Sequence, residues 1–188
     1  MNEMVDLILD DAKERMDKAV AHSRTEFASI RSGRAAPTLV EKLTVQAYGV
    51  DMRLQEMASI AVPEARQLLI TPHDPGNIDA VERAIRTSDL GLSPSSDGRS
   101  LRLNFPPLTE ERRKELVRIV KKMAEEGRIS IRNIRRDARK ELENAEKDNQ
   151  LTADELTRAE KELDRLTQAS EATVDGALAT KEEELLEV

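Results

Sequence analysis

The sequence predicts an α+β fold: a long three-helix bundle with a small β/α/β domain inserted between its first and second helices. Charged residues make up 36% and aromatic residues 2% of the 188-residue chain, a composition typical of long helices. Both ends of the chain carry apolar residues at helical spacing, whereas residues 38–105 alternate and contain turn residues. Because a single long amphipathic helix cannot bury its own apolar stripe, the three helices are expected to pack together.

The first helix is expected over residues 3–31. Its apolar residues recur at steps of three and four, and Gly33 and Pro37 follow as helix-breaking residues. The predicted buried stripe consists of Val5, Leu9, Ala12, Met16, Ala19, Ser23, Phe27 and Ile30.

The next segment has the alternation of a β-hairpin and then of further strands. Leu43, Val45 and Ala47 alternate with polar residues, and Gly49 ends this first strand. A second short strand is predicted over 51–55, and β-rich sequence flanks Pro63 on both sides.

One helix and a second hairpin complete the inserted domain. The helix is predicted over 77–88, with Asn77 as a possible N-cap. Asp97-Gly98 is a favourable hairpin dipeptide, and the strand 100–105 follows it. A domain of about 70 residues has a small core but can fold.

Two further long helices are predicted after the proline pair at 106–107. Thr109 is the expected N-cap of a helix over 109–146, and Gly127 within it should weaken the helix by about 1 kcal/mol relative to Ala. Thr152 and Glu155 form a capping-box pattern that begins the last helix at residue 153. The predicted stripe of this helix consists of Leu156, Ala159, Leu163, Leu166, Ser170, Thr173, Ala177 and Leu178.

These elements predict two domains joined by two chain crossings. Residues 1–30 and 106–188 are assigned to the bundle and residues 31–105 to the insert, with hinge linkers near 31–36 and 104–107. The alternative is that these breakers are ordinary ends of elements. The predicted hinge residues are Ser32, Gly33, Phe105, Pro106 and Pro107, and the substitution Gly33→Pro is expected to rigidify the hinge.

A basic segment stands out in a chain whose net charge is −7. Residues 112–140 carry twelve Lys/Arg against four Asp/Glu, whereas residues 141–188 carry five against fifteen. At about 100° per residue, one stripe covering roughly a third of the helix circumference collects Arg128, Arg132, Arg135, Arg136 and Arg139. A neighbouring face, predicted to be the core side of this helix, collects Ile131, Ile134, Ala138, Leu142 and Ala145.

The arginine stripe has two readings. Arginine suits bidentate contact with phosphate, which favours a site for structured RNA or duplex nucleic acid. Alternatively, the arginines pair with acids on the last helix, where Glu155, Glu160, Glu162 and Asp164 are available.

No catalytic site can be assembled from the sequence. The chain has no cysteine and two histidines, His22 and His73, and it lacks nucleotide-binding and zinc-protease motifs. Neither an enzyme activity, nor a metal, nor any cofactor is therefore predicted. No apolar run is long enough for a membrane span, and the acidic N-terminus does not resemble a signal peptide, so a cytoplasmic protein without a membrane partner is expected.

Several ordered segments together resemble the bacterial ribosome recycling factor family. They are SIRSGRAAP (29–37), SIAVPEAR (59–66), SDLGL (88–92), DGRSLRLNFPPLTEERRKELV (97–117), KKMAEEGR (121–128), IRNIRRDA (131–138) and the terminal KEEELLEV. They cover nearly the whole chain, and PPLTEERRKELV together with IRNIRRDA is specific to that family.

The resemblance implies an L-shaped, tRNA-like outline and a function on the ribosome. Proteins of this family bind the ribosome after termination, mainly to RNA of the large subunit, and split it into subunits together with elongation factor G and its GTP hydrolysis. By motif match, Arg132, Arg135 and Arg136 are the first candidates for ribosomal RNA binding, with Arg128 and Arg139 beside them. Arg31 and Arg34 in SIRSGR are second candidates. A monomer is expected.

Three positions depart from the family pattern. Ala47 replaces a more usual aromatic residue, so the surface of the inserted domain is expected to have one aromatic ring fewer. Gly127 stands where Ala is more usual and is expected to make the long helix less stable. Arg139 adds a positive charge to the arginine stripe. A further hypothesis is that the acidic remainder of the chain limits nonspecific RNA binding.

Two other classes remain open. A helical interaction protein would use the arginines only for internal pairing, and a nucleic-acid-modifying enzyme is disfavoured because no nucleophile or metal set is visible.

Overall fold

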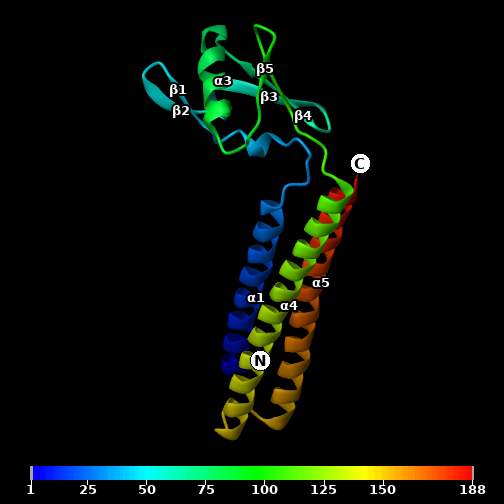
Figure 1. The fold of residues 1–188 in the computed structure, drawn as a ribbon. Helices are drawn as coiled ribbons and strands as arrows, with labels where there is room; N and C mark the ends of the chain where they lie inside the picture. The colour runs from blue at the N-terminus through cyan, green and yellow to red at the C-terminus, as the bar shows by residue number, and fades with distance from the viewer. Residues whose placement is uncertain (1, 188) are drawn as a thin grey trace. The chain divides into compact units, whose positions relative to one another are not determined.

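The computed structural model describes residues 2–187, and the chain in it divides into two compact units. The first unit contains the chain up to Arg31 and from Thr109 onward, and it is a bundle of long helices. The second is Ser32–Leu108 and contains all the strands. The predicted α+β class, with a long helical bundle and a small sheet domain, is confirmed (Figure 1).

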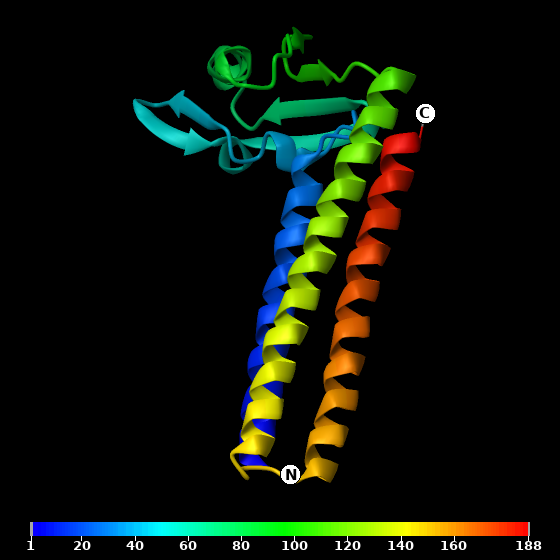
Figure 2. The ribbon, with the colours of Figure 1, turned by 60° about the horizontal axis from the view of Figure 1, so that its bottom comes forward.

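Three helices form the bundle: α1 (Glu3–Ser29), α4 (Glu110–Lys147) and α5 (Ala153–Leu186). α4 runs antiparallel to both of its neighbours, and a short loop joins it to α5 (Figure 2). None of the helices among the described residues is long and apolar enough to cross a membrane.

The predicted caps fix the starts of α4 and α5. The Thr109 hydroxyl accepts a hydrogen bond from the Arg112 backbone N–H at 3.1 Å. At the start of α5, the Glu155 N–H donates to the Thr152 hydroxyl at 3.2 Å, and the Thr152 N–H donates to the Glu155 carboxylate at 2.8 Å. Each cap satisfies backbone donors that lack an intrahelical partner, so the sequence predicted both helix starts within one residue.

The bundle core follows the predicted stripe on α4 and part of that on α5. The α4 residues predicted to face the core are all buried: Ile131, Ile134, Ala138, Leu142 and Ala145. On α5 the fully buried residues are Ala159, Leu163, Thr167, Val174 and Leu185. The predicted Ser170, Thr173, Ala177 and Leu178 are only partly buried, because the C-terminal half of α5 turns Val174 to the core instead.

Gly127 marks a close approach between α1 and α4. A Cβ atom added there would lie 2.3 Å from the Ser23 hydroxyl oxygen, and Ser23 is 1% exposed. The glycine is therefore a packing requirement at this crossing, and the expectation that it merely softens the helix was incomplete.

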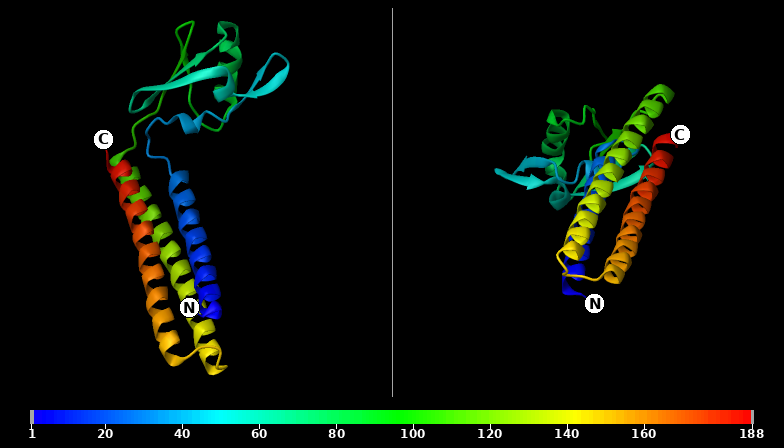
Figure 3. Two further views of the ribbon diagram at one scale, coloured as in Figure 1. Left: turned by 180° about the vertical axis from the view of Figure 1, so that it is seen from behind. Right: turned by 90° about the horizontal axis from the view of Figure 1, so that it is seen from below.

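The small unit contains a two-stranded hairpin and a four-stranded antiparallel sheet (Figure 3). The hairpin pairs β1 (Thr44–Ala47) with β2 (Val50–Arg53). The larger sheet has the order β3-β4-β6-β5, with bounds β3 (Ala58–Glu64), β4 (Gln67–Pro72), β6 (Leu101–Asn104) and β5 (Ser95–Ser96). The helical segments are α2 (Leu54–Met57), α3 (Ile78–Thr87), η1 (Pro37–Leu39) and η2 (Pro75–Asn77).

The core of the small unit lies where α3, the hairpin and the sheet meet. It includes Val45 from β1, Ile70 from β4, Val81 and Ile85 from α3, and Leu103 from β6, each 0% exposed. Alternate residues of β4 and β6 face this core, as the period of a strand requires.

Three local expectations for the small unit have mixed outcomes. The β-rich sequence on both sides of Pro63 forms β3 and β4, and Pro63 itself is tolerated near the end of β3 because β3 is an edge strand whose register shifts between Ala61 and Glu64. Asn77 holds the predicted N-cap position of α3, but its side chain makes no cap hydrogen bond. Ala47 is 5% exposed and belongs to the core of the small unit, not to its surface.

Candidate nucleic-acid interface

The predicted arginine stripe lies on α4, beside the face that packs into the bundle core. The helical period places Arg128, Arg132, Arg135 and Arg139 next to α5, which runs antiparallel to α4. All four form ion pairs with carboxylates of α5. We call these four interhelical pairs the arginine ladder.

The first two pairs of the ladder use acids that the sequence analysis did not single out. The Asp175 carboxylate lies 2.7 Å from an Arg128 guanidinium nitrogen, and the Glu171 carboxylate lies 2.8 Å from Arg132 Nε. Glu125, on α4 itself, also contacts both arginines, at 2.9 Å and 3.4 Å.

The other two pairs use acids that were among the candidates. Arg135 lies 2.6 Å from Asp164, and Arg139 lies 3.2 Å from Glu160. Arg139 also contacts Glu143 on its own helix at 3.1 Å. The other two candidate acids act elsewhere on α5, because one belongs to the capping box and the other pairs with an arginine of its own helix.

The internal pairing that was one reading of the stripe is therefore present in the structure. It leaves the arginines accessible, since the side chains of Arg132, Arg135 and Arg139 are 51%, 40% and 53% exposed. Exposed ion pairs of this kind are worth about 0–1 kcal/mol each, so they can be exchanged for other anions. Pairing in the unbound protein and contact with phosphate are compatible.

Arg128 is the most enclosed member of the ladder. Its side chain is 21% exposed, and its Nε donates to Asp175 at 2.8 Å while its other guanidinium nitrogens contact Asp175 and Glu125. The hydrogen bond to Asp175 raises the pKa of Arg128 above its already high ordinary value. This group is permanently charged and held in one orientation.

Arg136 differs from the four arginines of the ladder. It is exposed and makes no ion pair with any other residue of the part of the chain that the structure describes. The helical period puts it on the side of α4 opposite the core, on the same line as Arg118, Lys122 and Lys140, which likewise have no ion pair within residues 2–187. We call these four residues the open basic face.

The second candidates, Arg31 and Arg34, fall in different compact units. Arg31 ends the bundle unit, Arg34 belongs to the small unit, and both are exposed.

Gly33 has a backbone conformation that glycine accommodates best. Its φ is +77°, in the left-handed region, and a Cβ added there would lie 3.3 Å from Leu108 Cγ. Proline fixes φ near −65° and cannot adopt this conformation. Gly33→Pro, the substitution expected to rigidify the hinge, would also force the backbone out of this conformation.

The two linkers enter the small unit side by side. The Ala35 N–H donates to the Ala65 carbonyl at 2.9 Å, and the Phe105 N–H donates to the Arg66 carbonyl at 2.8 Å. Ala65 and Arg66 form the turn between β3 and β4, so one hairpin turn fixes both chain crossings at their small-unit ends. Pro106 and Pro107 follow, both exposed.

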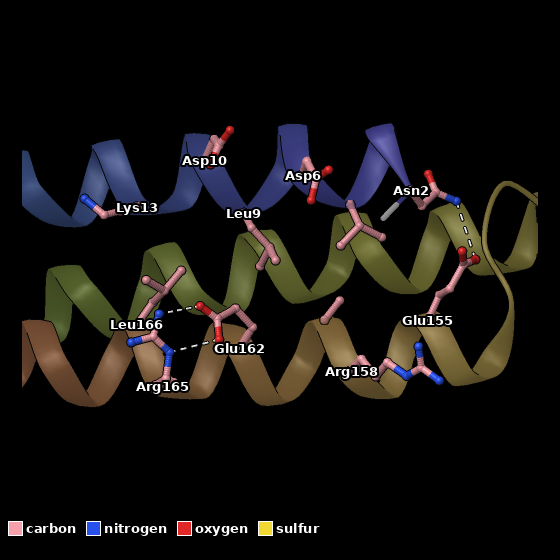
Figure 4. A pocket seen from close by; sticks show the side chains of 12 residues that line it. Asn2, Asp6, Leu9, Asp10, Lys13, Glu155, Arg158, Glu162, Arg165 and Leu166 are labelled. Atoms are coloured by element: carbon pink, nitrogen blue, oxygen red, sulfur yellow. Dashed lines mark hydrogen bonds and ion pairs between the residues drawn. The ribbon is translucent and has the colours of Figure 1, made fainter.

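A groove of about 590 Å³ runs between α1 and α5 (Figure 4). Its apolar lining includes Val5, Leu9 and Leu166, and charged side chains flank it. In the close-up, Arg165, which lines the groove, is paired with Glu162. No group of three or more metal-ligating side chains occurs among residues 2–187.

The Asp74 carboxylate, next to His73, is engaged by groups of its own loop and of the β1–β2 hairpin. The Asp74 carboxylate accepts hydrogen bonds from the Tyr48 hydroxyl and from the Gly76 N–H. These two bonds lower the pKa of Asp74, and its interaction with Tyr48 raises the pKa of that phenol. Asp74 thus serves to order the loop before α3.

Comparison with known proteins decides what this bundle and sheet domain represent. The family model described as ribosome recycling factor matches residues 23–186. The chain belongs to the ribosome recycling factor family. It is 49% identical over 188 residues to the ribosome-recycling factor of Rubrobacter xylanophilus, covering 100% of both chains. It is 46% identical over 181 residues to that of Bacillus subtilis, covering 96% of this chain and 98% of the relative.

Solved structures of ribosome recycling factors have the same fold. A solution structure of the ribosome recycling factor aligns with a TM-score of 0.78 and 36% identity, covering 100% of both chains. A structure of the T. thermophilus ribosome recycling factor and the E. coli elongation factor G bound to the E. coli post-termination complex aligns with a TM-score of 0.64 and 41% identity, covering 97% and 99%.

Proposed function

We propose that this chain binds ribosomes after termination and, together with elongation factor G and GTP, splits them into subunits for a new round of translation. The observation that carries the proposal is the full-length similarity to ribosome recycling factors, in both sequence and fold. One of the similar structures describes such a factor with elongation factor G on a post-termination complex.

The bundle is proposed to contact RNA of the large subunit through α4. A rigid helix that presents half-exposed guanidinium groups at regular spacing suits the phosphates of structured RNA. The proposed contacts are Arg128, Arg132, Arg135, Arg136 and Arg139, with Arg31 and Arg34 as additional ones. The open basic face adds positive charge on the side of α4 that points away from the bundle core, which supports α4 as the helix that faces RNA.

The chain is proposed to act by binding and movement, as a cytoplasmic monomer without a cofactor. The hydrolysis of GTP belongs to elongation factor G, so no bond-breaking step needs a group from this chain. The two linkers are proposed to bend while the bundle stays bound. Both linkers are hydrogen-bonded to the same β3–β4 turn. This supports the proposed bending, because a partner that pushes on the small unit would move both linker ends together.

Salt dependence of ribosome binding tests this proposal most directly. Each phosphate contact contributes about 0.7–0.9 to the slope of log K against log salt. The variant Arg136→Gln removes a guanidinium without leaving a carboxylate unpaired, so a shallower slope would report RNA contact alone. Arg158→Gln removes the same charge from the exposed surface of α5 and likewise leaves no carboxylate of the described residues unpaired, so it is the matched control.

We expect Arg136→Gln to bind vacant large subunits more weakly and with a slope reduced by about one unit, while Arg158→Gln resembles the wild type. Subunit splitting with elongation factor G and GTP is then followed by light scattering. A wild-type chain that neither binds large subunits nor splits ribosomes would refute the proposed function. Equal effects of both substitutions would refute the assignment of Arg136 to the interface.

A further inference from the structure

We infer that the α5 carboxylates Asp164, Glu171 and Asp175 determine RNA selectivity: they occupy the arginine donors that phosphates would use and so compete against RNA that offers few matching phosphates. The inference rests on the proposed function, since it assumes that α4 contacts ribosomal RNA. It assigns a role to α5, a helix that carries none of the predicted RNA-binding residues.

The carboxylates contact the guanidinium edges in the way a phosphate would. A single Asp175 oxygen lies 2.8 Å from Arg128 Nε and 2.7 Å from a terminal nitrogen of the same guanidinium. The Glu171 carboxylate accepts from Arg132 Nε at 2.8 Å. Because carboxylate and phosphate oxygens both accept charge-assisted hydrogen bonds from guanidinium, they are alternative ligands of the same donors.

Exchange between the two ligands favours RNA with several correctly placed phosphates. A phosphate that reaches Arg132 gains one contact but displaces Glu171 and then lies beside a negative charge. An isolated contact therefore adds little affinity. An RNA surface whose phosphates contact Arg132, Arg135 and the open basic face together gains several contacts at once, because these groups lie on one rigid helix. The combined gain offsets the free energy lost when several carboxylates are displaced.

The charge distribution supports this role. Residues 112–140 alone carry twelve basic and four acidic side chains, which would bind polyanions indiscriminately if all were free. The ladder neutralises four of these arginines within the bundle. Arg136 has no such partner and can contact phosphate without any exchange.

The test compares two double variants that change net charge equally. Glu171→Gln/Asp175→Asn removes two competitors from the ladder. Glu14→Gln/Glu162→Gln removes two paired carboxylates elsewhere, which frees Lys18 and an α5 arginine instead. Both variants and the wild type are titrated with a short RNA duplex of unrelated sequence and with vacant large subunits, at several salt concentrations.

We expect Glu171→Gln/Asp175→Asn to bind the unrelated duplex about 2- to 30-fold tighter than the wild type, the gain given by two exposed pairs of ordinary strength. Its salt slope should steepen by at most about 0.7–0.9 for each of Arg128 and Arg132, which then keep only Glu125 as a carboxylate partner. Affinity for large subunits should rise less, so selectivity falls. Adding Arg132→Gln to this variant should reverse about half of the gain.

Three outcomes would overturn the inference. These are an equal gain in the control variant, unchanged duplex binding in the ladder variant, or an equal gain for duplex and large subunits. If Glu171→Gln/Asp175→Asn loses helicity by circular dichroism, the single variant Asp164→Asn is measured against Glu162→Gln by the same criteria. Failure of the proposed function is distinguishable, because it appears as absent large-subunit binding by the wild type whatever the duplex titrations give.

Discussion

Substituting Gly127 by Ala is predicted to destabilise the bundle, although the same change stabilises most helices. In an exposed helix interior, Gly→Ala gains about 1 kcal/mol from propensity. Here the new Cβ would lie 2.3 Å from the Ser23 hydroxyl oxygen and 3.9 Å from Val174 Cγ1. Ser23 must rotate or the helices must separate, and overpacking of this kind costs about 1–3 kcal/mol. The balance is a net loss of about 1 kcal/mol.

The second substitution in the test is Ser23→Ala. The Ser23 hydroxyl is buried and has no hydrogen-bond partner among the described residues, so removing it should be neutral or stabilising. In the double variant the added Cβ would face the remaining Cβ of residue 23 at 3.5 Å, an ordinary van der Waals contact. The helix propensity gained at position 127 should then appear in full.

The assay is a double-mutant cycle on the free energy of unfolding. Urea unfolding followed by far-ultraviolet circular dichroism mainly reports the long helices. We expect Gly127→Ala to be less stable than the wild type by about 1 kcal/mol, the double variant to be more stable by about 1 kcal/mol, and the coupling to exceed about 1 kcal/mol. Additive effects, or a Gly127→Ala variant more stable than the wild type, would refute the packing argument.

Three other predictions concern single features. The chain has one tyrosine and no tryptophan, so the near-ultraviolet absorbance of Tyr48 should titrate with a pKa above the usual 10.0. The stability contributed by the Tyr48–Asp74 hydrogen bond should be present below the unfolded-state pKa and lost as pH rises through the raised folded-state pKa. Asp74→Asn should lower the pH midpoint of the Tyr48 titration. Gly33→Ala should lower the melting temperature more than Gly91→Ala, because both glycines have positive φ but, of the two, only Gly33 has neighbours within 4 Å of the added Cβ. Equal losses would mean that the positive φ alone destabilises both variants and that contact with Leu108 adds nothing. Thr152→Ala should cost about 0.5–2 kcal/mol in urea unfolding through the lost cap of α5.

The ends and the core faces of the helices could be predicted from sequence because they depend on local rules. Thr109 and the Thr152/Glu155 pair satisfy backbone donors within their own first turn, so their effect does not depend on tertiary contacts. The core face of α4 follows from strong apolar residues at helical spacing. On α5 small and polar residues dominate, so the period was ambiguous and the burial of Thr167 and Val174 was missed.

The partners of the arginines could be predicted only in part, because they depend on the register between two helices. Two helices joined by a short antiparallel loop bring together residues that lie equally far from that loop. This rule points from Arg139 to Glu160 and, further along, from Arg132 to Glu171. The acids named from the sequence, within residues 155–164, lie in the first third of α5, so Glu171 and Asp175 were not among them. The contact between Gly127 and Ser23 is of the same kind and leaves no local signal.

The three faces of α4 make the arginines unequal probes of RNA binding. Arg132→Ala removes a proposed phosphate contact, but it also removes the pair with Glu171 that a phosphate has to displace, so the loss of affinity understates the strength of the contact. Arg136→Gln releases no carboxylate of the described residues and measures contact alone. If Glu171 competes with phosphate, Arg132→Ala should weaken binding more in a Glu171→Gln background than in the wild type, because phosphate contact with Arg132 then no longer requires displacement of Glu171. If the ladder only stabilises the bundle, the loss on Arg132→Ala should be the same in both backgrounds. The nonadditivity of this pair therefore separates recognition from stabilisation on a helix that does both.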